Sequence, residues 1–261
     1  MTQLTAYILA KNESANIGRC VDALSACQIR TVVLDSGSTD DTVTIAKTKG
    51  AVVENYLYHD HLSALAYVCM RTASSALAMV LDADMVVTPE LVAEAVSLIA
   101  SNKAEVILAP IRMYWCGSAM RYGSLCPPKP FLFRGGREYF IAAGHCEVLQ
   151  AGVRQATTTC ELIHNDQKHF RDYLQSQCRY SAALQARASA GELKFRDRLR
   201  LKTPFLMALV PAVSLFFKGG IFDGLTGLGY ALDRLIAEAI FYRESIADRL
   251  LSANAKSSQL K

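Results

Sequence analysis

The sequence of 261 residues lacks several features that would assign it to a common protein class. It has eight cysteines, but no two stand in a C-x-x-C pair, which disfavours a structural zinc site. The formal net charge is only +4, so bulk charge indicates no nucleic-acid partner. Residues 1–5 lack a basic region followed by an apolar run, so we expect no secretory signal, reduced thiols and a cytosolic protein.

Short apolar segments alternate with helical patterns along the first 110 residues. A helix signal needs apolar residues three and four positions apart, and Ile17, Cys20, Val21 and Leu24 show this spacing. This alternation predicts an α/β fold with a mostly parallel sheet that helices cover on both faces. We expect strands over residues 4–10, 31–34, 51–54, 77–81 and 105–111, and further helices over residues 38–49, 62–73 and 89–101.

Polar clusters follow directly after three of the predicted strands, at residues 11–13, 35–38 and 82–84. In parallel α/β sheets, ligands bind beyond the carboxyl ends of the strands. The three clusters are therefore expected to converge on one edge of the sheet. Ser38 and Asp41 are a predicted cap of the second helix, and Thr88 is a predicted N-cap before Pro89.

The second half of the chain is less regular. We expect loops and short antiparallel strands such as 131–134, and then helices over residues 168–190 and 226–250. In residues 194–202, five basic residues alternate with apolar ones, and the next fifteen residues carry no charge. This pattern is typical of a segment that lies in a membrane interface, although a buried helical hairpin explains it as well.

The acidic pair Asp82 and Asp84 is the sharpest local motif. Two carboxylates at this spacing can bind Mg²⁺ or Mn²⁺ together with the oxygens of a diphosphate. The same pattern also occurs by chance in loops that only cap a helix. The apolar strand before the pair, together with two further polar strand ends, favours the metal site.

With these motifs the chain resembles the family 2 glycosyltransferases of the GT-A fold. The matching segments are Ile8–Glu13, Val33–Asp40 and Val80–Asp84, in the same order. A weaker resemblance through Leu162–His164 and Gln177–Tyr180 points to the branch that includes lipopolysaccharide core glucosyltransferases. The resemblance implies a GT-A domain over residues 1–190, with a nucleotide-binding half (1–111), an acceptor half (112–190) and a helical tail (191–261).

The resemblance also implies roles for individual residues. Asn12, Glu13, Asp35, Ser36 and Asp82 would line the nucleotide site, and Asp84 would bind the metal. The alternative for Asp35 is a turn residue in the stretch Asp-Ser-Gly-Ser.

His164 is a candidate third ligand, or else a packed core histidine, and Arg179 is a candidate phosphate contact, or else a helix-surface charge. We regard His59, Asp60 and His61 as surface residues, because their short loop offers no further ligands.

An inverting transfer needs a carboxylate that deprotonates the acceptor hydroxyl. The branch often has a His-Glu pair, and the nearest stretch here is Gly144-His145-Cys146-Glu147, in which Cys146 is inserted. Glu147 is the candidate base with His145 beside it, and Asp84 and Asp166 are alternatives. The branch also has a basic residue and an asparagine in the third helix, whereas this chain has Leu62-Ser63-Ala64-Leu65-Ala66.

The sequence therefore predicts a metal-dependent, inverting glycosyltransferase. We expect a nucleotide-sugar donor, with UDP-glucose suggested by analogy, and a glycan or lipid-linked acceptor in bacterial envelope polysaccharide or lipopolysaccharide synthesis. We expect a peripheral position on the anionic inner face of the cytoplasmic membrane. A catalytically degenerate binding or scaffold protein of the same fold is the alternative. A nucleotidyltransferase is disfavoured because no glycine-rich loop follows the first strand, and a dehydrogenase because no G-x-G-x-x-G follows any predicted strand.

Overall fold

The computed structural model describes residues 3–143, 146–191, 203 and 209–259. The chain divides into two compact units. The first comprises Met1–Ala119 with Cys126–Lys168, and the second comprises Met120–Leu125 with His169–Lys261. The division at residues 111 and 190 that the resemblance implied stays a prediction.

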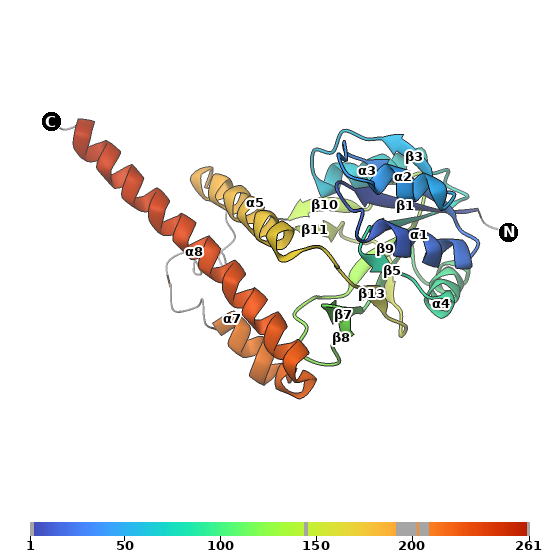
Figure 1. Ribbon diagram of the computed structural model, residues 1–261. Coiled ribbons are helices and arrows are strands. Elements are labelled where there is room, and N and C mark those ends of the chain that lie inside the picture. The colour runs from blue at the N-terminus through green and yellow to red at the C-terminus, as the bar shows by residue number, and fades with distance from the viewer. Residues whose placement is uncertain (1–2, 144–145, 192–202, 204–208, 260–261) are drawn as a thin grey trace. The chain divides into compact units, whose positions relative to one another are not determined.

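A seven-stranded sheet forms the centre of the first unit, which Figure 1 shows with its flanking helices. The strand order is β12-β6-β9-β4-β1-β2-β3. Only β9 runs antiparallel to its neighbours, β4 and β6, and the other pairs are parallel. The mostly parallel α/β sheet expected for the GT-A fold is thus confirmed. The strands are β1 (Leu4–Ala10), β2 (Arg30–Asp35), β3 (Val52–Asn55), β4 (Leu77–Asp82), β6 (Val106–Ala109), β9 (Lys129–Arg134) and β12 (Gln155–Thr157).

Helices cover both faces of this sheet because its strands are apolar on both sides. Ala6 and Ile8 of β1 belong to a core cluster that also contains residues of α1 (Ile17–Ala26), α2 (Thr42–Thr48) and α4 (Pro89–Ala100). Tyr7 points into a second cluster with residues of α3 (His61–Arg71) and β10 (Phe140–Ala143). This alternation along one strand is what a sheet that is buried on both faces requires.

The single strand expected over residues 105–111 is wrong. Pro110 separates β6 from β7 (Ile111–Trp115), because proline has no N–H to donate to a sheet ladder. The chain there leaves the large sheet and enters a four-stranded one, in the order β5-β13-β7-β8. Its other strands are β5 (Met85–Val86), β8 (Ser118–Ala119) and β13 (Leu162–His164), and a separate hairpin pairs β10 with β11 (Cys146–Leu149).

The two predicted helix caps have different outcomes. Thr88 is the N-cap of α4, where its side chain accepts a hydrogen bond from Leu91 N, as expected. The cap at Ser38 is wrong, because α2 begins only at Thr42 and the Ser38 hydroxyl donates to Asp35 instead. A capping pattern in the sequence does not reveal a competing carboxylate nearby.

The second unit is helical. It contains α5 (Phe170–Ser189), α7 (Leu209–Ala212), the π-helix η2 (Val213–Phe217), the 3-10 helix η3 (Gly220–Asp223) and α8 (Leu225–Gln259). The helices α5 and α8 pack through Leu184, Phe241 and Tyr242, so both predicted helices are confirmed. The basic run 194–202 lies outside the described residues. In the described chain, no helix has the length and hydrophobicity of a membrane span.

Glu94 on α4 anchors the loop that leads into β13. Its carboxylate accepts hydrogen bonds from the backbone N–H groups of Thr159 (2.8 Å) and Cys160 (2.9 Å), and from the Thr159 hydroxyl (3.0 Å). These hydrogen bonds favour the charged carboxylate and lower the pKa of Glu94 to about 2.

We predict that Glu94→Gln lowers the free energy of unfolding by about 1 kcal/mol at neutral pH. Because the folded pKa lies below the ordinary value of 4.5, this stability is complete above pH 4.5 and is lost as the pH falls toward 2. Urea denaturation across this range measures it. Hydrogen exchange should accelerate at Thr159 and Cys160 in E94Q but not in E90Q, a control on the same helix. Equal exchange in both variants would contradict the anchoring role.

Candidate functional site

The register of the parallel strands brings the predicted site loops together. Ala10 at the end of β1 pairs with Asp35 of β2, and Leu9 pairs with Asp82 of β4. The two aspartates thus end strands on either side of β1, which places these strands about 10 Å apart. The expectation that the three polar clusters share one edge is confirmed.

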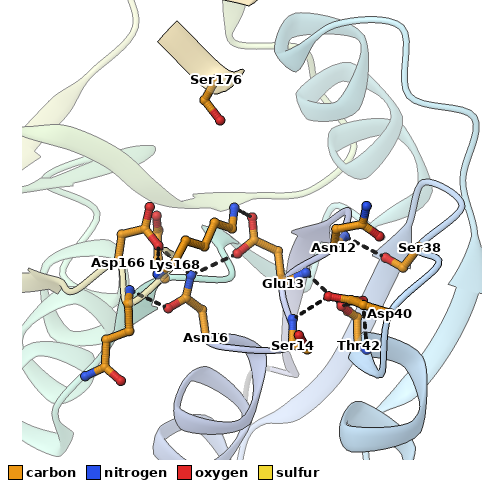
Figure 2. A network of polar contacts seen from close by, with 12 residues as sticks. Asn12, Glu13, Ser14, Asn16, Ser38, Asp40, Thr42, Asp166, Lys168 and Ser176 are labelled. Carbon is orange, nitrogen blue, oxygen red and sulfur yellow. Dashed lines mark hydrogen bonds and ion pairs between the residues drawn. The ribbon is translucent and has the colours of Figure 1, made fainter. Parts of the chain in front are cut away.

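Asn12 joins the first two of these loops. Its backbone is left-handed (φ +54°), a conformation that asparagine tolerates. Its N–H donates to the Ser38 hydroxyl (2.9 Å), and its side-chain oxygen accepts from Thr39 N (2.8 Å), as Figure 2 shows in part. Asn12 therefore fixes the spacing between the ends of β1 and β2.

Asp35 is buried, with 4% of its surface exposed, and its own loop satisfies its carboxylate. It accepts hydrogen bonds from Gly37 N and Ser38 N (both 3.1 Å) and from the Ser38 hydroxyl (2.5 Å). Gly37 has φ +79°, which this tight turn requires. The interpretation of Asp35 as a turn residue is thus confirmed. Ser36 continues the ladder by donating its N–H to Ala10 O (2.9 Å).

A buried polar network fastens residues 165–168 to the end of β1 (Figure 2). Asn16 is fully buried, and its amide nitrogen donates to Glu13 (3.0 Å) and Asp166 (2.8 Å). Its amide oxygen accepts from Gln167 N (2.9 Å) and from Arg19 (2.8 Å). One asparagine side chain thus uses both of its polar atoms to connect α1 with a segment some 150 residues away.

Glu13 and Lys168 form an ion pair within this network. Burial raises the pKa of Glu13, although the hydrogen bonds from Lys168 and Asn16 oppose the shift. Burial by itself lowers the pKa of Lys168, but the pairing with Glu13 outweighs it and the pKa is raised. The pair thus joins Glu13 to the segment that follows β13 at the edge of the sheet.

Asp82 forms an ion pair with Lys129 of β9, the strand that pairs antiparallel with β4 over Leu77–Met79. Burial favours the neutral acid, but the charges of Lys129, His61 and His164 oppose this effect. They lower the pKa of Asp82 to about 2. Asp82 therefore keeps its negative charge beside a lysine ammonium group.

Asp84 lies beside His164, with 3.4 Å between Asp84 Oδ2 and His164 Nε2. The pairing of β13 with β5 causes this contact, because it sets His164 opposite Met85. Burial raises the pKa of Asp84, and the negative charges of Asp82 and Asp166 add to the shift. Within the described residues, no hydrogen-bond donor reaches Asp84 Oδ1, a buried atom.

Carboxyl groups outnumber lysines at this site. Glu13, Asp82, Asp84 and Asp166 lie near the amino groups of Lys129 and Lys168, which makes four carboxyl groups against two amines. A divalent cation would compensate such an excess. In the described part of the chain no three acidic, histidine or cysteine side chains converge as metal ligands.

The remaining predicted residues are not brought into this cluster by any described contact. His145 lies outside the described residues. Of Glu147 only the backbone is described, in β11 opposite Ala142. Arg179 lies in the second unit, exposed on α5, where it donates to the Ser176 hydroxyl (2.9 Å).

The interpretation of the 59–61 segment as surface is wrong for His61. Both of its ring nitrogens are shielded from solvent, and its charge acts on Asp82. Asp60 is the N-cap of α3 and accepts from Ser63 N (2.6 Å). The sequence showed a short polar loop but not that α3 begins beside the acidic pair.

The sequence reasoning also missed Asn16, Lys129 and Lys168. A polar residue among the apolar positions of α1 was a signal for Asn16, since buried polar groups need partners. Lys129 stands in a proline-rich stretch that was read as loop. Its role becomes visible only when the register of β9 against β4 is known.

Comparisons with known proteins agree on the class. The sequence model of the family described as "Glycosyl transferase family 2" matches residues 5–157, more than half of the chain. An uncharacterized glycosyltransferase of Rickettsia prowazekii is 45% identical over 53 residues, which are 20% of this chain and 18% of that protein. One from Rickettsia typhi is 43% identical over the same length. The matched segment thus spans less than a fifth of these relatives.

Among solved structures, the chain is similar to glucosyl-3-phosphoglycerate synthase from Mycobacterium tuberculosis in complex with Mn²⁺, UDP and glucosyl-3-phosphoglycerate. The identity is 21% and the TM-score 0.37, over 42% of this chain and 44% of that one.

We predict that Asn16→Ala lowers the free energy of unfolding by about 3 kcal/mol, because it leaves several buried partners without hydrogen bonds. The Asn55→Ala variant, at an exposed strand end, should change it by less than about 0.5 kcal/mol. Urea denaturation compares the two, and limited proteolysis should cut near residues 165–168 faster in N16A. Equal stability of the two variants would show that the network does not hold this segment.

Proposed function

Because the chain belongs to glycosyl transferase family 2, we propose that it transfers a sugar from a UDP-sugar to a glycan or lipid-linked acceptor. The observation that carries this proposal is the position of Asp84 and His164 beside Asp82, at the edge where β1 and β2 also end. UDP-glucose is the proposed donor, and envelope polysaccharide or lipopolysaccharide the proposed product. The proposed place of action is the inner face of the cytoplasmic membrane.

Asp84 and His164 would hold the metal, Mg²⁺ or Mn²⁺. The buried Asp84 Oδ1 without a described partner and the excess of carboxyl groups over lysines fit a divalent cation. Such an ion, when bound, offsets the charge that develops on a departing diphosphate. Asp84 and His164 lie close enough to act on one ion without a large movement of either strand.

The nucleotide would occupy the edge formed by Asn12, Glu13, Asp35, Ser36 and Asp82. A carboxylate oxygen has two lone pairs, so the hydrogen bonds within the Asp35 loop leave it able to accept another from a base or ribose. The rigid turn at Asp35 supports this role because a preorganised acceptor loses little freedom on binding.

Lys129 would contact the diphosphate. The third helix has no basic residue in the segment Leu62–Ala66 that could contact the phosphates. The ammonium group of Lys129 is paired with Asp82, two residues before Asp84, and could take that role. A lysine placed there can neutralise phosphate oxygens as a point charge. Arg179 of the second unit is proposed as a further phosphate contact.

Glu147 is the proposed base, with His145 orienting it or contacting phosphate. The base would take the proton of the acceptor hydroxyl as its oxygen bonds to the sugar carbon and the bond to UDP breaks on the opposite face. Asp166 suits this task less well, because its carboxylate accepts hydrogen bonds from Asn16 and from Lys168 N (3.0 Å).

A catalytically degenerate binding or scaffold protein remains the second proposal, favoured by the inserted Cys146 and the missing polar residues of the third helix. Radiolabelled UDP-glucose with Mn²⁺ separates the two. Release or transfer of labelled glucose supports the enzyme, whereas UDP binding without turnover of any nucleotide sugar in a thermal-shift screen supports the scaffold.

We predict that Asp84→Asn removes the Mn²⁺-dependent part of UDP binding while the free energy of unfolding changes by less than about 1 kcal/mol. Isothermal titration with and without MnCl₂ measures the binding. Asp22→Asn, which removes an exposed carboxylate paired with Lys49, is the matched control and should bind like the native protein. If D84N still gains affinity from Mn²⁺, the metal role of Asp84 is wrong.

We predict that Lys129→Met weakens UDP binding about tenfold, since hydrogen bonds to charged groups contribute about 1.5–3 kcal/mol. The same substitution should weaken the binding of UMP, which lacks the second phosphate, by less than it weakens the binding of UDP. The K129R variant should bind UDP better than K129M. Lys49→Met removes an exposed lysine and is the control. Equal losses for UMP and UDP would show that Lys129 does not contact the second phosphate.

A further inference from the structure

The turn between η2 and α8 exposes large apolar side chains on one end of the second unit. We call this surface the aromatic tip: Phe216, Phe217, Ile221, Phe222 and Leu225. Phe217, Phe222 and Leu225 are each more than 80% exposed. The surface continues along α8 through Leu228 and Leu232, which share a helix face with Leu225. Contiguous apolar surface of this kind marks an interaction site.

The aromatic tip is firmly built at its base. Asp223 accepts hydrogen bonds from Arg121 N (2.8 Å) and Tyr122 N (3.0 Å). Gly123 N donates to Lys218 O (3.0 Å), and the buried Ser214 hydroxyl donates to Gly123 O (2.7 Å). These bonds hold the segment 120–125 against η2 and η3, so the apolar side chains stand on a fixed support.

Close backbone packing adds to this support. A Cβ at Gly227 would lie 1.8 Å from the Gly220 carbonyl oxygen, so only glycine allows α8 to begin there. The rings of Tyr122 and Phe222 meet edge to face, with centroids 6.1 Å apart. The backbone of this turn is therefore tightly packed, although its outer apolar side chains are exposed to water.

The charges around the aromatic tip are positive. Arg121 and Lys218 are exposed beside it, and the Arg121 guanidinium lies 5.7 Å from the centre of the Tyr122 ring. The one carboxylate within the turn, Asp223, is occupied by backbone N–H groups. Apolar side chains with a basic and tyrosine rim complement a bilayer whose headgroups are anionic.

A second copy of the chain fits this surface less well. A two-fold contact through the aromatic tip would bring Arg121 and Lys218 of one copy toward the same residues of the other, and like charges would repel. Anionic lipid headgroups accept both cations while the acyl region takes the apolar side chains.

We propose that the aromatic tip inserts into the surface of an anionic lipid bilayer and anchors the second unit there. This inference deepens the proposed function only with respect to the place of action at a membrane. It holds whether or not the first unit binds UDP. It also differs from attraction by the basic run 194–202, since the aromatic tip binds through apolar side chains that the structure describes.

The test is cosedimentation of the full chain with vesicles of phosphatidylglycerol or of phosphatidylcholine. The triple variant F217S/F222S/L225S should lose affinity for phosphatidylglycerol vesicles about tenfold or more. The matched control I246S/L250S/L251S removes three exposed apolar side chains from the far part of α8 and should bind like the native chain. Both variants keep every basic residue. Equal binding by the two variants, or no binding by the native chain, would overturn the proposal.

A second measurement reports insertion directly. The chain has a single tryptophan, Trp115, so W115F/F222W places the only indole in the aromatic tip. Its emission should shift to shorter wavelength with phosphatidylglycerol vesicles and be quenched by brominated acyl chains. An emission that does not shift would reject the lipid site. So would light scattering that shows a dimer of the native chain which the triple tip variant disrupts and the control variant does not. UDP titration of the same samples keeps the donor proposal separate, because the tip variant should bind UDP like the native chain.

Discussion

The parallel pairing of β1 with both β2 and β4 is the constraint on which the rest of the site depends. It sets Ala10 level with Asp35, and Leu9 level with Asp82. Because these strands are buried on both faces, a shift of one residue would turn each apolar side chain toward the wrong core cluster. The hydrophobic cores therefore fix the register, and the register places the polar strand ends together.

A single buried amide provides the second constraint. Asn16 carries hydrogen bonds from the start of α1 to Asp166 and Gln167, and Asn165 N donates to Asp84 O (2.9 Å). The chain is thereby held directly after His164. A buried polar network of this kind is costly unless it is satisfied, so it favours one arrangement of the loop over others. Packing alone would leave the loop free to slide.

The sequence predicted the parallel core and its edge because strong local signals determined both. Apolar runs ended at Asp35 and Asp82, and helix periodicity separated them. It failed where the partner was distant in sequence. Pro110 diverted a strand into a second sheet, and Ser38 preferred a carboxylate to a helix cap. Lys129 joined Asp82 through an antiparallel strand that no local pattern pairs with β4.

The two aspartates of the pair are chemically different although they stand only two residues apart. Lys129 holds Asp82 ionised, so its charge is already compensated. Asp84 lies beside the imidazole of His164, and its buried Oδ1 has no partner among the described residues. A cation entering the cluster would therefore find an unused carboxylate oxygen at Asp84, whereas at Asp82 it would compete with Lys129. The ion pair of Lys129 with the first aspartate thus supports the proposal that the second one binds the metal.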